Sequence, residues 1–315
     1  MKIATFGARF FGGQVSRIDE GFLKLGHEIN YEFPDIIFSN DPGYYEEAYK
    51  LKEKNPKAKL ILNVLDIPPH YIDSSKYDIS RYPYIHNPNR NFDPETLIVW
   101  LKKADIITCI CEEVQWQLKN WCGFDSIVIL NPIKDVSYLN IHVQNKIKNK
   151  RGIPYKYLYV GRACDINKRF NLVYKTMIEL GDPADSLAVI GSENPGWGDY
   201  YGVQEDNILN YFYNSVEYFM FPSAFKSIGL PALEAVVCKT IPIVTNDDPV
   251  TKEFWKDIGV HVDKITESIL DPDWNKKAKK FIEEYSEIYK QKFNKITIAK
   301  NIINLYNIEY GQRYF

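Results

Sequence analysis

Apolar residues in the first half of the chain fall into short runs separated by longer stretches with a helical period. The short runs predict strands at 2–7, 35–39, 60–64, 106–110 and 126–130. Between the first two runs, Val15, Ile18, Phe22 and Leu25 are spaced as one face of a helix. Strands that alternate with helices indicate right-handed βαβ units and therefore a parallel sheet.

The same alternation restarts after a lysine-rich segment at 146–152, which is followed by Pro154 and which we interpret as a domain linker. The second half has strands predicted at 155–160, 187–190, 216–221 and 241–245, a helix at 228–238 and a helical tail over 273–310. Two Rossmann-like halves in tandem are the most economical α/β architecture. We expect a first domain at 1–150, a second at 151–294, and a C-terminal helix at 295–315 that packs back on the first.

Composition narrows the choice of partners and cofactors. The 315 residues carry 39 lysines and arginines against 41 aspartates and glutamates, so the formal charge is −2 and bulk electrostatic binding to nucleic acid or anionic lipid is disfavoured. The chain contains no membrane-length apolar run, and residues 1–11 lack the apolar core of a signal peptide, so we expect a cytoplasmic protein. Five scattered cysteines without a CxxC pair predict neither a disulfide framework nor a zinc site.

We expect the functional residues in the turns that follow the carboxyl ends of strands, because ligands of doubly wound sheets bind there. Gly12 and Gly13 precede the first helix, whose N-terminal amides attract phosphate; a plain tight turn is the alternative. Gly161 and Arg162 follow the first strand of the second half, and Lys168 comes shortly after. The two cations are either an anion site or ordinary solvated surface charges.

The segment 221–235 holds a further candidate site. Pro231 suits the first helical position, which leaves the amides of Gly229 and Leu230 at a helix N-terminus that could hold a diphosphate. Glu234 lies about one turn into that helix, and its side chain leans back toward the N-terminus. Its carboxylate is placed either to accept hydrogen bonds from a ribose diol or to stabilise the helix dipole.

Jointly these segments resemble the retaining GT-B-fold glycosyltransferases with a Glu-x7-Glu motif, of the group 1, family 4-like type. The segments that carry the resemblance are Gly12-Gly13-Gln14, 25–29, 103–107, Asn131-Pro132, 159–162 with Lys168, and 221–235. The resemblance implies two Rossmann-like domains facing a central cleft, with the hydroxyl acceptor on the first and the nucleotide-sugar donor mainly on the second. It also implies that no metal is required and that no cofactor is bound beyond the sugar nucleotide.

The resemblance assigns roles to individual residues. Arg162 and Lys168 would neutralise the donor pyrophosphate as the glycosidic bond breaks, and Glu234 would hold the ribose hydroxyls. The backbone expected to line the donor site belongs to Gly12, Gly13, Gly161, Gly229 and Leu230.

The chain departs from the family pattern at the first glutamate of the motif, which is replaced by Lys226. A lysine reverses the charge where the family has a carboxylate near the transferred sugar. An altered donor sugar, another carboxylate nearby and a lost activity are three competing explanations. The loop 163–167 is also about one residue longer than the family pattern, which predicts a reshaped turn.

The sequence gives fewer indications of the residues that bind the acceptor. Asp66 follows the strand 60–64, in a region where family members place a His-Asp pair, and is a candidate to orient the acceptor or assist removal of its proton. His70 is a second candidate, and an ordinary loop hydrogen bond explains either residue equally well. The acceptor class stays open among a glycan, a lipid-linked sugar, a small metabolite and a protein.

Three alternative functions remain. The turn within 234–244 is similar to one in phage DNA α-glucosyltransferases, but the near-neutral first half counts against a DNA acceptor. Lys226 instead favours a non-catalytic protein that binds a sugar nucleotide or glycan. An epimerase or phosphorylase on the same fold is disfavoured by the continuous segment 221–235.

Overall fold

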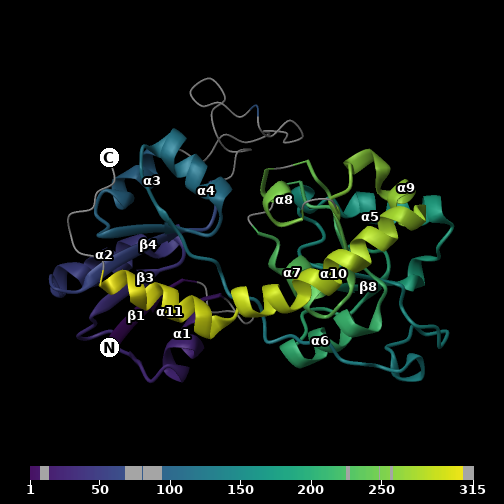
Figure 1. The fold of residues 1–315 in the computed structure, drawn as a ribbon, viewed down its shortest axis with the longest axis horizontal. Helices are drawn as coiled ribbons and strands as arrows, with labels where there is room; N and C mark the ends of the chain where they lie inside the picture. Colours follow the sequence, from purple (N-terminus) through teal and green to yellow (C-terminus); the bar gives the residue numbers. More distant parts are fainter. Residues whose placement is uncertain are drawn as a thin grey trace. The chain divides into compact units, whose positions relative to one another are not determined.

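A computed structural model describes residues 1–7, 14–67, 80, 94–224, 228–247, 249–255 and 258–307. The chain divides into two compact units (Figure 1). Unit 1 comprises Met1–Pro132 together with Lys292–Phe315, and unit 2 comprises Ile133–Gln291. Among the described residues, no helix combines the length and the apolar character needed to cross a membrane.

Unit 1 is built on a parallel sheet with the strand order β2-β1-β3-β4-β5-β6 in its described part. The central strands β3 and β4 are buried along their whole length, which explains why most of their residues are apolar. The strands are β1 (Lys2–Phe6), β2 (Glu28–Ile29), β3 (Ile36–Ser39), β4 (Lys59–Val64), β5 (Ile106–Cys109) and β6 (Ile127–Val128).

Helices join these strands and cover the sheet (Figure 1). Those of unit 1 are α1 (Gln14–Lys24), α2 (Tyr45–Lys54), α3 (Pro94–Leu101), α4 (Glu112–Gln117), which continues as a π-helical turn over Leu118–Cys122, and α11 (Lys295–Tyr306). The predicted helical face of α1 is observed, since Val15, Ile18 and Phe22 are buried.

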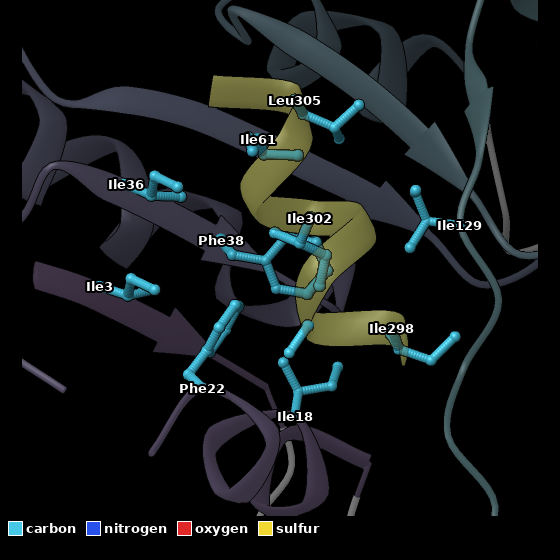
Figure 2. Packing of buried hydrophobic residues seen from close by; sticks show 11 residues of the cluster. Ile3, Ile18, Phe22, Ile36, Phe38, Ile61, Ile129, Ile298, Ile302 and Leu305 are labelled. Carbon is cyan, nitrogen blue, oxygen red and sulfur yellow. The ribbon is translucent and has the colours of Figure 1, made fainter. Parts of the chain in front are cut away.

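The C-terminal helix α11 belongs to the core of unit 1. Ile298, Ile302 and Leu305 pack with residues of α1 and of the central strands, among them Phe22 and Phe38 (Figure 2). The tail predicted as helical over 273–310 forms two helices, α10 (Pro272–Lys292) and α11, with an interruption at 293–294, and α11 begins at the predicted residue 295. Asn294 causes the restart, since its side chain accepts a hydrogen bond from the Ile296 N–H at 2.8 Å and caps α11.

A buried lysine of β4 receives the far end of α11. The Nζ atom of Lys59 donates to the carbonyl oxygens of Tyr306 and Leu305 at 2.6 and 3.3 Å, so a positive charge meets the negative end of the helix dipole. Lys59 is 9% exposed, and this burial lowers the pKa of its ammonium group.

Replacing Lys59 with methionine is expected to lower the free energy of unfolding by about 1–2 kcal/mol, because the helix-end carbonyls lose a charged donor. The pKa of Lys59 is lower in the folded chain than in the unfolded chain, so between these two pKa values the folded chain binds fewer protons. The stability of wild type relative to K59M should therefore rise with pH up to about pH 10. Denaturant unfolding at several pH values measures both effects. The exposed Lys57→Met is the control and should change neither quantity; a K59M curve that superimposes on wild type contradicts the assignment.

Unit 2 contains a parallel sheet with the strand order β11-β10-β7-β8-β9 in its described part. The strands are β7 (Tyr157–Val160), β8 (Leu187–Ile190), β9 (Asp199–Tyr200), β10 (Tyr218–Phe221) and β11 (Ile241–Val244). The helices are α5 (Phe170–Leu180), α6 (Asp206–Ser215), α7 (Leu230–Val237), α8 (Pro249–Phe254), α9 (Ile265–Leu270) and α10 (Pro272–Lys292). Because β7 and β10 are adjacent and parallel, the loops that leave their carboxyl ends meet at one edge of the sheet.

The boundaries between the units differ from the predicted 150/151 and 294/295. The chain enters unit 2 after Pro132 and leaves it after Gln291. The backbone after Pro132 is already held by side chains of α6: the Ser137 N–H donates to Asn210 Oδ1 at 3.0 Å and the Leu139 N–H to Asn214 Oδ1 at 2.6 Å. The lysine-rich composition of 146–152 indicates only that this segment is exposed to solvent. It does not indicate which of the two units the segment packs on.

Candidate functional site

The loop after β7 begins with a close approach of two glycines. The Gly161 N–H donates to the Ile190 carbonyl at 2.9 Å, and a Cβ atom on Gly191 would lie 2.0 Å from the Gly161 carbonyl oxygen. The neighbouring Tyr159 is buried, and this burial, with the carboxylates of Asp165 and Glu193 nearby, raises the pKa of its hydroxyl. At the start of the loop the backbones of Gly161 and Gly191 are therefore in close contact, and the neutral Tyr159 hydroxyl lies beside them.

Adding one methyl group at Gly191 should disrupt this start. Gly191→Ala is expected to cost about 1–3 kcal/mol of unfolding free energy, because the obstacle is backbone and cannot rotate away. Thermal or denaturant unfolding measures the loss. Gly43→Ala is the control, since its added Cβ would meet only the end of the Asp41 side chain at 3.3 Å; equal stability of the two variants would contradict the close approach.

The two predicted cations lie on this loop. Arg162 is exposed, and its guanidinium forms an ion pair with Asp165 at 2.9 Å. Asp165 also accepts a hydrogen bond from the Asn167 N–H at 3.0 Å and so caps a single 3₁₀ turn over Ile166–Lys168. This 3₁₀ turn overlaps the end of the loop 163–167 and places half-buried Lys168 at its last position.

The loops after β7 and β10 are joined by direct hydrogen bonds. The Asn167 carbonyl accepts from the Ala224 N–H at 2.8 Å and from the Ser223 hydroxyl at 3.2 Å. The segment that carries Arg162 and Lys168 is therefore tied to the segment that leads toward α7.

The start of α7 requires a glycine. Gly229 precedes the helix in the left-handed conformation, with φ +75°, and a Cβ atom there would lie 2.8 Å from the Phe221 ring. The helix begins at Leu230, which is half-buried, so Pro231 is its second residue and not its first as predicted. The N-terminus of α7, the positive end of its helix dipole, therefore follows in the chain shortly after Ser223 and Ala224, which Asn167 binds.

Glu234, the predicted ribose ligand, is buried within unit 2. Its Oε1 accepts from the Lys134 N–H at 3.1 Å and its Oε2 from the Tyr213 hydroxyl at 3.0 Å. Burial first, and the Glu234 carboxylate second, raise the pKa of Cys238 one turn further along. Both carboxylate oxygens of Glu234 therefore have hydrogen-bond donors within unit 2.

The remaining predicted residues fall in two groups. Asp66 lies just after β4 in unit 1 and is half-buried. Gly12, Gly13 and Lys226 lie outside the described residues, as does His70.

Sequence reasoning missed the residues that organise this region. The sequence predicts only a loop at Asp165 and Asn167, and it does not predict the donors to Glu234. The signal available in advance was weak: an Asp in a loop often caps a turn by accepting the backbone N–H two residues further on. Tyr213 and Lys134 carried no signal, because they are distant from Glu234 in the chain.

No family model matches the chain. Over 140 residues it is 32% identical to O-antigen chain mannosyltransferase B of Escherichia coli. That match covers 42% of this chain and 36% of the relative, so the chain spans well under two thirds of the curated relative's length.

Solved structures match along nearly the whole chain. HepE of Anabaena, solved with UDP and glucose, matches with a TM-score of 0.68 at 12% identity. The match covers 97% of this chain and 99% of the HepE chain. An α-glucosyltransferase solved with UDP and a DNA 13-mer gives a TM-score of 0.59 at 12% identity and covers 98% of this chain and 100% of its own. Identities this low show the fold alone. The predicted GT-B fold, with two Rossmann-like units on parallel sheets, is confirmed.

Proposed function

We propose that the chain is a glycosyltransferase that moves a sugar from a nucleoside-diphosphate sugar to a hydroxyl group, with retention of the anomeric configuration. The observation that carries the proposal is the joining of the Arg162–Lys168 segment to the segment before α7 by the Asn167 carbonyl. In this proposal Arg162, Lys168 and the N-terminus of α7 act together at this edge of the sheet. The mannosyltransferase relative and the HepE structure with UDP and glucose support the same reaction class.

In this mechanism the protein's own charges replace a divalent metal. Arg162 and Lys168 offset the negative charge that accumulates on the diphosphate as the bond to the sugar breaks. The N-terminal amides of α7 add a positive dipole at the same edge. Arg162 leaves Asp165 to do this, a small rearrangement because its side chain is 65% exposed.

The other assignments complete the proposal. Glu234 holds the donor ribose, and the Lys134 N–H and the Tyr213 hydroxyl fix the orientation of its carboxylate. Asp66 of unit 1 orients the acceptor hydroxyl or accepts its proton. The transfer tolerates Lys226 at the position where the related enzymes carry glutamate.

A transfer assay tests the reaction. The chain is incubated with UDP-glucose, UDP-N-acetylglucosamine or GDP-mannose, with and without chelator. The acceptors are simple glycosides, lipid-linked sugars and DNA with a hydroxymethylated base. We expect chelator-insensitive release of the nucleoside diphosphate, and a product whose anomeric coupling, measured by NMR, equals that of the donor.

The same assay separates the alternatives. An inverted product would contradict retention. Donor binding without transfer in wild type and in Lys226→Glu would replace the transferase proposal with a non-catalytic binding protein. Transfer to the DNA acceptor alone would favour a DNA-modifying enzyme.

A further inference from the structure

The residue that ends the cationic loop has an unusual backbone. Arg169 lies in the left-handed region at φ +50°, between the 3₁₀ turn and α5. Residues other than glycine keep this conformation only where their surroundings enforce it. The Arg169 guanidinium forms an ion pair with Asp247, which follows β11.

This ion pair is buried. The Asp247 side chain is 1% exposed and that of Arg169 is 14% exposed. Arg169 binds the Oδ2 of Asp247, whereas Oδ1 is buried and has no hydrogen-bond partner within the described part of the chain. The Asp247 carboxylate therefore depends on Arg169, since removing one member of a buried pair leaves an uncompensated charge.

The pair completes a set of ties among three strand ends. Asn167 already binds the segment after β10 through Ser223 and Ala224. The Thr245 hydroxyl, after β11, donates to the Ser223 carbonyl at 3.3 Å. The Arg169–Asp247 pair adds the direct tie between the loop after β7 and the segment after β11. The loop 161–168 is thus anchored at its start by Gly161, near its end by Asn167 and directly after its end by Arg169.

We propose that Arg169 and Asp247 are positioning residues: their buried ion pair holds the loop 161–168, and with it Arg162 and Lys168, in place for the donor diphosphate. Arg169 is assigned to anchoring and Arg162 to the phosphate, because the Arg169 side chain is 14% exposed and that of Arg162 is 65% exposed. The identity of the ligand rests on the proposed function, whereas the anchoring of the loop does not.

The variants separate anchoring from general stability. Asp247→Asn keeps the shape of the side chain and removes its charge. The double variant R169M/D247N removes both charges, so it leaves no unpaired ion in the interior and guards against a single variant that fails to fold. Arg169→Lys keeps the cation. Arg151→Met is the matched control, since it breaks an ion pair with Asp185 in the same unit, where the Arg151 side chain is 54% exposed.

Hydrogen exchange of the ligand-free protein tests the anchoring. Peptides covering 161–170 should exchange about tenfold faster or more in D247N and in R169M/D247N than in wild type, because local opening governs exchange. Arg151→Met should leave these peptides unchanged, and R169K should resemble wild type. Unchanged exchange in folded D247N or in the folded double variant overturns the proposal.

UDP titration, repeated with GDP and ADP, tests the consequence. The affinity of D247N and of R169M/D247N for the diphosphate that wild type binds should fall by about tenfold or more, because a small misplacement of binding groups is costly. Arg151→Met should bind as wild type does, and R169K should recover most of the affinity. Faster exchange with unchanged affinity overturns the positioning role. A wild type that binds none of the three diphosphates overturns the proposed function, and the exchange result still decides whether the pair anchors the loop.

Discussion

Replacing Arg162 with alanine is expected to weaken binding of the nucleoside-diphosphate donor by about 10- to 1,000-fold, the range for losing a preorganised charge partner. Stability should change by less than about 0.5 kcal/mol, because the Arg162 side chain is 65% exposed and its one ion pair is at the surface. Calorimetric titration with the donor diphosphate, together with denaturant unfolding, measures both quantities.

A second variant separates the two effects of this substitution. Arg162→Ala also leaves Asp165 without its ion-pair partner, beside the proposed phosphate site. Adding Asp165→Asn removes that repulsion, so the double variant should recover part of the affinity and remain weaker than wild type. Arg151→Ala, at a surface ion pair of the same unit, is the control and should bind the donor normally. Unchanged donor affinity in R162A would exclude Arg162 from the diphosphate site.

Glu234→Ala is expected to be the most destabilising change at the site. It removes the acceptor of the Lys134 N–H and of the Tyr213 hydroxyl from a position that is 2% exposed, which should cost about 2–4 kcal/mol of unfolding free energy. Donor binding should be lost as well. Unfolding monitored by circular dichroism and donor titration below the transition temperature measure the two losses.

Glu234→Gln is the informative partner of that variant. The amide keeps the shape and one carbonyl acceptor, and the Tyr213 hydroxyl is able to turn and accept from the amide nitrogen. This variant should therefore stay within about 1.5 kcal/mol of wild-type stability and still bind the donor about tenfold more weakly or worse, because a charged acceptor of the ribose is lost. If E234Q binds the donor as wild type does, Glu234 is a structural residue and does not hold the ribose.

The parallel sheets were predictable because their central strands are buried on both faces. β3 and β4 are mostly apolar, and α1 shows one apolar face. The edge strands β2 and β9 were missed, since each has two residues and two residues have no period. The predicted strand at 126–130 is observed only as Ile127–Val128, at the other edge.

The candidate site was predictable to the level of loops. A parallel sheet brings the carboxyl ends of its strands to one edge, so Arg162, Lys168 and the start of α7 could be assigned to a common region from strand positions alone. The contacts that hold these loops in place could not be predicted. Glu234 binds a backbone group 100 residues away, and Arg169 pairs with Asp247 78 residues away, and one sequence contains no signal that links such distant positions.

The most direct test of the central claim is calorimetric titration of the wild-type chain with UDP, GDP and ADP, with and without chelator. The account predicts that one diphosphate binds selectively, that chelator leaves the affinity unchanged, and that the melting temperature rises with its concentration, because a ligand that binds only the folded state stabilises it. Absence of binding by all three, or binding that requires a divalent metal, would contradict a donor site built from Arg162, Lys168 and the N-terminus of α7.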